Sequence, residues 1–98
     1  MSAQEPKVAV LMGSKNDWNI MQAACEQLDA LGIANEARVI SAHRTPQRHH
    51  DFVTEQGPAE GVKVFICGAG MAAHLAGVTA ALTSSPVIGV PLESGGMG

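Results

Sequence analysis

Residues 7–12 read Lys-Val-Ala-Val-Leu-Met, and Gly13 follows them directly. This near-continuous apolar run is typical of a strand that is covered on both faces of a sheet. From Asp17 onward the apolar residues take helical spacing, at Trp18, Met21, Ala24, Cys25, Leu28 and Leu31. Gly32 stands where a left-handed cap would end that helix. Residues 7–32 therefore predict a strand, a turn and a helix that returns across the sheet.

Three further apolar runs have the composition of strands, and helical patterns separate them. The strands are predicted at about 36–40, 62–67 and 87–90. A short helix is expected from Pro46 to about 56–58, with Thr45 as its cap, and an alanine-rich helix at about 71–82. Each crossover is long enough for parallel pairing. The sequence therefore predicts one domain over residues 1–98, an α/β fold with a doubly wound parallel sheet.

Composition and charge exclude several classes of partner. Of the 98 residues, 46% are hydrophobic and 15% charged, and the net charge of -3 gives no basic surface for nucleic acid. No apolar segment is long enough to span a membrane, and residues 1–7 lack a signal-peptide pattern, so no membrane partner is expected. Cys25 and Cys67 lack metal-ligand spacing and are predicted to be buried thiols of a reducing compartment, the cytoplasm.

The end of the chain departs from this pattern. Residues 93–98 read Glu-Ser-Gly-Gly-Met-Gly and predict a loop after the fourth strand, with no helix behind it to cover the sheet. We therefore expect the fourth strand to be partly uncovered and unpaired, as in a partial domain.

The first three strands each lead into a loop of unusual composition, and such loops meet at one edge of a parallel sheet. The first loop, 13–17, carries Ser14 and Asp17 at the spacing of a capping box, which is one interpretation of both residues. The other is functional. Asp17 would accept hydrogen bonds from sugar hydroxyls, while Ser14 and nearby amides hold a polar group.

The second loop, 41–46, reads Ser-Ala-His-Arg-Thr-Pro. Histidine is the side chain best suited to proton transfer near neutral pH, so His43 is the candidate general acid and base. Arg44 can bind a phosphate with two parallel hydrogen bonds, and Ser41 can add a hydroxyl. His49 and His50 follow on the next helix and are predicted to be surface residues without a role.

The third loop, 68–75, reads Gly-Ala-Gly-Met-Ala-Ala-His-Leu. Its G-x-G-x-x-A spacing matches a dinucleotide fingerprint, with Glu93 as a possible ribose ligand, although it follows the third strand rather than the first. Small residues also let the backbone approach any flat substrate closely. His74 is either a packed helix residue or part of the site, and its position does not decide between them.

Four blocks together resemble a known family. Residues 12–18, 41–46, 68–77 and 87–91 are similar to the bacterial-type N5-carboxyaminoimidazole ribonucleotide mutases of purine synthesis (class I, the catalytic subunit of phosphoribosylaminoimidazole carboxylase). The animal-type branch typically has lysine in place of Arg44 and lacks the Ala-Ala-His-Leu segment, so the resemblance favours the mutase branch.

The resemblance implies a flavodoxin-like α/β/α sandwich, here without its last strand and C-terminal helices, assembled as a homo-octamer and using neither a metal nor an organic cofactor. It implies a small-molecule ribonucleotide substrate whose carboxyl group moves from the exocyclic amine to ring carbon 4, on the way to IMP. His43 would donate and then recover the proton. The implied substrate-binding residues are Ser14, Asn16 (usually serine), Asp17, Ser41, Arg44, Gly68, Ala69, Gly70, His74 and Leu75.

Within this set, the resemblance implies that Asp17 binds the ribose and that Ser41 and Arg44 bind the 5′-phosphate. The amides of 68–75, with His74, would line the pocket for carboxylate and carbon dioxide. Two alternatives stay open. One is a non-catalytic nucleotide-binding module that takes a dinucleotide such as NAD on the third loop. The other is an inactive fragment that associates with full-length subunits.

Overall fold

The computed structural model describes residues 6–69 and 74–92. In chain order it contains β1 (Lys7–Met12), the 3-10 turn η1 (Lys15–Asp17), α1 (Trp18–Ala30), β2 (Ala34–Val39), α2 (Pro46–Asp51), the π-helical turn η2 (Phe52–Gln56), α3 (Gly57–Ala59), β3 (Val62–Ala69), α4 (His74–Leu82) and β4 (Val87–Pro91). None of the helices in these two ranges has the length and apolar character needed to cross a membrane.

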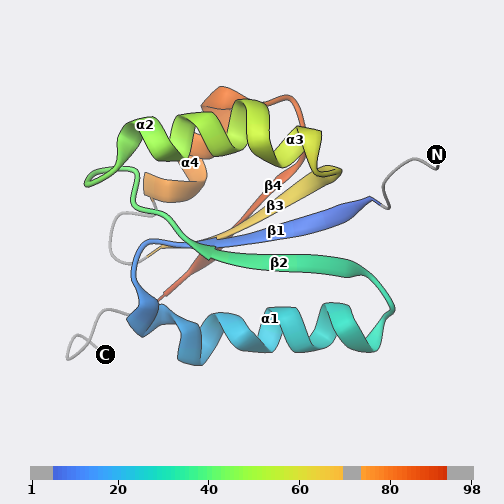
Figure 1. The fold of residues 1–98 in the computed structure, drawn as a ribbon. Helices are drawn as coiled ribbons and strands as arrows, with labels where there is room; N and C mark the ends of the chain where they lie inside the picture. Colours follow the sequence, from blue (N-terminus) through green and yellow to red (C-terminus); the bar gives the residue numbers. More distant parts are fainter. Residues whose placement is uncertain (1–5, 70–73, 93–98) are drawn as a thin grey trace.

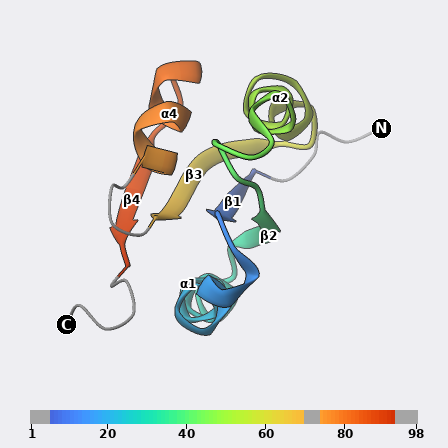
Figure 2. The same cartoon turned by 90° about the vertical axis from the view of Figure 1, so that its left-hand side faces the viewer.

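The four strands form one parallel sheet in the order β2-β1-β3-β4, which confirms the predicted fold class. α1 covers one face, while α2, η2, α3 and α4 cover the other, so the layers are helix, sheet and helix (Figures 1 and 2). β1 lies in the interior of the sheet and Val8 to Met12 are buried, as the apolar run predicts. β2 begins earlier than expected, at Ala34, and ends at Val39.

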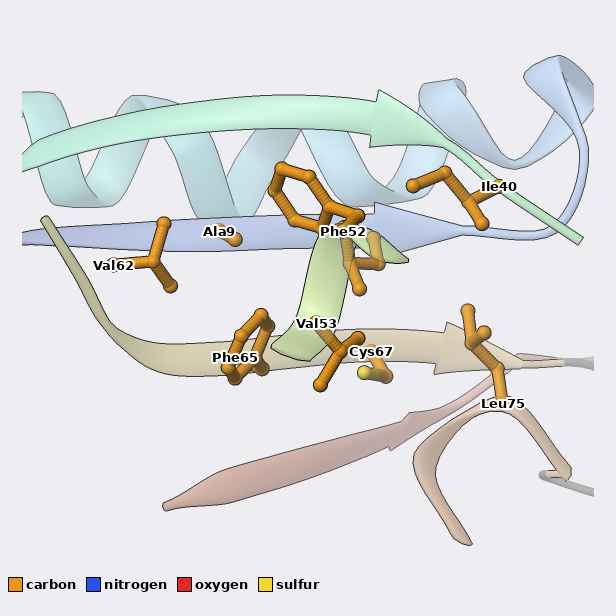
Figure 3. Close-up of a cluster of buried hydrophobic side chains, with 9 residues drawn as sticks. Ala9, Ile40, Phe52, Val53, Val62, Phe65, Cys67 and Leu75 are labelled. Carbon is orange, nitrogen blue, oxygen red and sulfur yellow. The ribbon is translucent and has the colours of Figure 1, made fainter. Parts of the chain in front are cut away.

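Each face of the sheet has its own apolar core. Figure 3 shows the larger one, in which Phe52 and Val53 of η2 lie over β1 and β3 beside Leu75 of α4. The Phe52 and Phe65 rings meet edge to face, with centroids 6.3 Å apart. On the opposite face, Met21 and Cys25 of α1 pack against β1. Cys25 and Cys67 are buried as predicted, and burial raises the pKa of both thiols.

α1 ends as the sequence predicts. Gly32 has φ of 75°, and its N–H donates to the carbonyl of Asp29 at 3.0 Å. The N–H of Ile33 donates to the carbonyl of Leu28 at 2.9 Å, which completes a Schellman cap. Glycine is favoured at position 32 because side chains disfavour this left-handed conformation.

The helical segment after β2 ends close to the predicted position but is less regular than predicted. It runs through α2, η2 and α3, and in η2 the N–H of Gly57 donates to the carbonyl of Phe52, five residues earlier. Pro46 takes the first helical position as expected. Thr45 precedes it, but its side chain makes no cap hydrogen bond. Its hydroxyl instead donates to the carbonyl of Ser41 at 3.0 Å.

The prediction that His49 is a surface residue is wrong. His49 is 1% exposed, and its Nε2 lies 2.7 Å from Oγ1 of Thr79, which is itself fully buried. His49 is on the side of α2 that faces α4, and a polar partner there satisfies the imidazole. Burial lowers the pKa of His49, and the neighbouring His50 adds to the effect. His50 is exposed, as predicted.

β4 is the outer strand of the described sheet, and it pairs there with β3 alone. Ile88 of β4 is 52% exposed. The expectation that this strand is partly uncovered is therefore confirmed for the residues that the structure describes.

Gly68 of β3 packs closely against the Met21 side chain of α1. A Cβ at this position would lie 2.9 Å from Cε of Met21, which is itself buried. We expect Gly68→Ala to lower the free energy of unfolding by about 1–3 kcal/mol through overpacking. Gly77→Ala is the matched control, because a Cβ there meets nothing within 4 Å and helical alanine is favoured by about 0.5–1 kcal/mol. Urea denaturation measures both, and equal effects would contradict this account.

The buried imidazole of His49 makes stability depend on pH. Because its pKa is lowered in the folded state, the unfolded chain binds more protons as the pH falls below the ordinary histidine value. We therefore expect the free energy of unfolding to decrease as the pH is lowered from neutrality through that value. Urea denaturation at several pH values should show a shallower decrease in His49→Gln, whereas His50→Gln should keep most of the original slope and lose only the smaller part that His50 adds.

Candidate functional site

The three loops singled out in the sequence lie at one edge of the sheet. The described ends of β1, β2 and β3 point in the same direction, toward the left in Figure 1 and toward the viewer in Figure 2. This follows from parallel pairing, because the carboxyl ends of all the strands then lie together. The candidate site is this edge, between the start of α1, the loop before α2 and the start of α4.

His43 and His74 meet across this edge. Nε2 of His43 lies 3.1 Å from Nδ1 of His74, although 31 residues separate them in the chain. The ring centroids are 5.2 Å apart, and the rings are tilted by 56°. Both residues are exposed, so the interpretation of His74 as a packed helix residue is wrong. The contact joins the second and third loops into one site.

Two facing imidazole nitrogens at this distance can share one proton. A neutral imidazole has one N–H donor and one acceptor nitrogen, so one ring donates and the other accepts. The tautomer of each ring therefore fixes the direction of the hydrogen bond. When one ring gives a proton to a bound molecule, the facing nitrogen of the other ring is a second basic group close to that ring.

Arg44 stands on a loop that its own hydrogen bonds hold in shape. The N–H of Arg44 donates to Oγ of Ser41 at 2.9 Å, and the N–H of Thr45 donates to the carbonyl of Ser41 at 3.0 Å. Arg44 is exposed, and its guanidinium forms no ion pair with the residues described at 6–69 and 74–92. Its charge can therefore bind an anion, while the Ser41 hydroxyl already accepts one hydrogen bond.

The first loop forms the turn η1 rather than a complete capping box. The N–H of Asn16 donates to Oγ of Ser14 at 3.1 Å, and the N–H of Asp17 donates to the carbonyl of Ser14. Asp17 takes the position before α1, but its carboxylate makes no cap hydrogen bond. Ser14 is therefore partly used by the turn, whereas the Asp17 carboxylate keeps its acceptor capacity for another group.

The third loop is described only at its two ends. Gly68 is buried and Ala69 is the last residue of β3, where it pairs with Pro91. Leu75 is 5% exposed and its side chain belongs to the core, so a role in binding falls to its backbone. The predicted site residue Gly70, the segment 71–73 and Glu93 lie outside the described residues.

A cavity of about 290 Å³ lies beside the first loop, on the α1 side of β2. It is lined by Met12, Lys15, Trp18, Ala37, Arg38 and Val39. None of the site residues predicted from sequence is among these lining residues. Among the residues that line the cavity, Lys15 lies between the predicted site residues Ser14 and Asn16 in the sequence. Lys15 itself was not predicted as a site residue. In the described ranges, no three His, Cys, Asp or Glu side chains are grouped so as to hold a metal ion.

Comparison with known proteins adds independent information. Residues 7–98 match the family model described as AIR carboxylase. The chain is 57% identical over 89 residues to an N5-carboxyaminoimidazole ribonucleotide mutase of Saccharolobus solfataricus, covering 91% of this chain and 56% of that protein. It is 50% identical over 90 residues to the protein of the same name from Bacillus subtilis, covering 92% and 55%. The chain thus spans about half the length of the curated relatives it matches.

Solved structures with the same fold support this relationship. The crystal structure of PurE from Treponema denticola matches with a TM-score of 0.84 and 28% identity, covering 92% of this chain and 57% of that one. The crystal structure of a PurE2 variant from the same organism also gives a TM-score of 0.84, at 26% identity, covering 93% and 57%.

Proposed function

Because the chain belongs to the AIR carboxylase family, we propose that it acts as an N5-carboxyaminoimidazole ribonucleotide mutase in purine synthesis. The observation that carries the proposal is the meeting of His43 and His74 at the carboxyl edge of the sheet, beside the exposed charge of Arg44. At this edge the imidazole pair can transfer a proton and the guanidinium can bind an anion. The mutase reaction needs both functions. The curated mutases named above are 50% and 57% identical to this chain.

The proposed reaction balances with one proton. Loss of carbon dioxide from the exocyclic amine leaves a nitrogen that must gain a proton. Attack of ring carbon 4 on the carbon dioxide then releases the proton of that carbon. The proton given in the first step is recovered in the second, so the reaction is an isomerisation and a single imidazole can serve both steps. His43 has this role, and no step requires a redox group.

His74 supports His43 in this scheme. The facing Nδ1 of His74, 3.1 Å from Nε2 of His43, orients the ring and favours one tautomer at the start of the reaction. It also offers a second nitrogen that can hold the proton while carbon dioxide changes its attachment point. This division of roles follows the common pattern in which a second group orients the catalytic base.

The remaining groups position the ribonucleotide. Arg44 binds the 5′-phosphate through its forked guanidinium, and the Ser41 hydroxyl donates to the same group. Ser14 and Asn16 present polar groups on the first loop, and Asp17 accepts hydrogen bonds from the ribose hydroxyls. Backbone amides of 68–75, with the small residues Gly68, Ala69 and Gly70, enclose the carboxylate and the released carbon dioxide. Holding that molecule beside carbon 4 raises its effective concentration.

We further propose that the chain functions in the cytoplasm as a homo-oligomer, an octamer as the family resemblance implies. The exposed apolar side chains Ile88 of β4, Val78 of α4 and Ile20 of α1 support association, because such surface is more stable when it is covered. Native mass spectrometry is expected to show a species with the mass of eight chains. A monomer at all micromolar concentrations would contradict this proposal.

The direct test is conversion of freshly prepared N5-carboxyaminoimidazole ribonucleotide by the 98-residue chain, without ATP, metal or bicarbonate. We expect turnover above the rate without protein. His43→Asn should lower kcat by about 100-fold or more, because an amide cannot carry the proton. Binding of aminoimidazole ribonucleotide, measured by calorimetry, should change little.

His50→Asn is the matched control, since His50 is an exposed imidazole on α2 that the site does not use. It should keep the parent kcat. Near-normal turnover in His43→Asn would refute the proton-transfer role. Tight binding of NAD with no affinity for aminoimidazole ribonucleotide would replace the mutase proposal with a dinucleotide-binding one.

A further inference from the structure

His49 and Thr79 form a buried polar contact between α2 and α4. His49 is 1% exposed and Thr79 is fully buried, and Nε2 of His49 lies 2.7 Å from Oγ1 of Thr79. They are the only polar side chains among the buried residues that the structure describes. Burying two polar groups carries a desolvation cost that an apolar pair would avoid. Filling the core therefore does not by itself account for these two polar side chains.

The two residues belong to the helices that carry or follow the two site histidines: α4 begins with His74, and α2 follows the loop of His43. His49 lies six residues after His43, on α2, and Thr79 lies five residues after His74, on α4. Thr79 is therefore about 7.5 Å along the α4 axis from His74, and His49 lies in the first turn of α2, directly after the loop that carries His43. The His49–Thr79 contact and the His43–His74 contact thus bridge the same two segments of the chain.

α4 also contributes an apolar side chain to this face. Leu75 packs into the cluster that contains Phe52 and Val53. Apolar contacts are not directional, so they fix the orientation of one helix against another less sharply than a hydrogen bond does. A short hydrogen bond between two buried side chains restricts both the distance and the orientation. The hydroxyl of Thr79 also lies next to Cys67 of β3, since it opposes the rise that burial causes in the pKa of that thiol.

We propose that His49 and Thr79 are positioning residues, whose hydrogen bond fixes α2 against α4 and thereby sets the distance between the site nitrogens of His43 and His74. Neither residue touches the substrate. Their hydrogen bond acts through the backbone of the two segments and keeps the imidazole pair aligned for proton transfer. The catalytic part of this inference rests on the mutase function proposed above, while the geometric part does not.

The test uses two variants that remove the hydrogen bond and two that keep it. His49→Leu and Thr79→Val replace the polar groups with apolar ones of similar size. His49→Gln places an amide nitrogen near the former Nε2, and Thr79→Ser keeps the hydroxyl. The ring contact of His43 and His74 is measured as the cross-peak between their ring protons by NMR, together with their imidazole nitrogen shifts. kcat and KM for the mutase reaction are measured on the same proteins.

We expect the cross-peak to weaken in His49→Leu and Thr79→Val. A displacement of this kind should lower kcat by about 10- to 100-fold. KM should change little, because Ser41 and Arg44 move together with His43 on one loop. The variants His49→Gln and Thr79→Ser should restore both signals. The double variant His49→Leu/Thr79→Val should be no worse than either single one, as expected for two halves of one interaction.

Cys25→Ala is the control for a loss of stability without a loss of alignment. Cys25 is buried on the opposite face of the sheet, in the cluster that α1 forms with β1. It should lower the unfolding midpoint while leaving the cross-peak and kcat unchanged. Should His49→Leu fail to fold, Thr79→Val still decides the question. An unchanged cross-peak and kcat in folded Thr79→Val would overturn the proposal. If the parent chain shows no turnover, the mutase function fails and the NMR comparison still tests the geometric inference.

Discussion

The parallel pairing of β1 with its two neighbours is the constraint on which the rest of the molecule depends. β1 is buried on both faces and hydrogen-bonds β2 on one side and β3 on the other. Because the three strands run in the same direction, their following loops leave from one edge. His43 and His74 can meet only for this reason, since one follows β2 and the other follows β3. The helices on the two faces then hold this arrangement in place.

The sequence was sufficient for the features that are governed by local chemistry. The apolar run 7–12 predicts an interior strand, and Gly32 ends α1 in the left-handed conformation expected of it. Convergence of the loops also follows from the parallel pairing that the sequence predicts. A place for His74 in the site was one of two open interpretations, and its contact with His43 was not predicted, because a single histidine at a helix start carries no information about its partner across the sheet edge.

Other features depend on partners that a local pattern does not reveal. His49 follows two exposed polar residues and precedes another histidine. Nothing nearby in the sequence therefore predicts that it is buried with Thr79 as its partner. Gly68 belongs to a glycine-rich loop that suggests ligand binding, yet a Cβ there would also meet the buried Met21 side chain of α1. Leu75, in the same motif, belongs to the core. In each case the deciding contact comes from a distant segment.

The π-helical turn η2 bears on how this fold can change in evolution. It closes a hydrogen bond from Gly57 to Phe52 around one more residue than an α-helix would enclose. Such a turn absorbs an inserted residue locally, without rotating the helix on either side of it. Lineages can therefore gain or lose a residue between Phe52 and Gln56 while α2 keeps its orientation toward α4. The length of η2 can therefore change in evolution without moving the carboxyl edge of the sheet, where His43 lies.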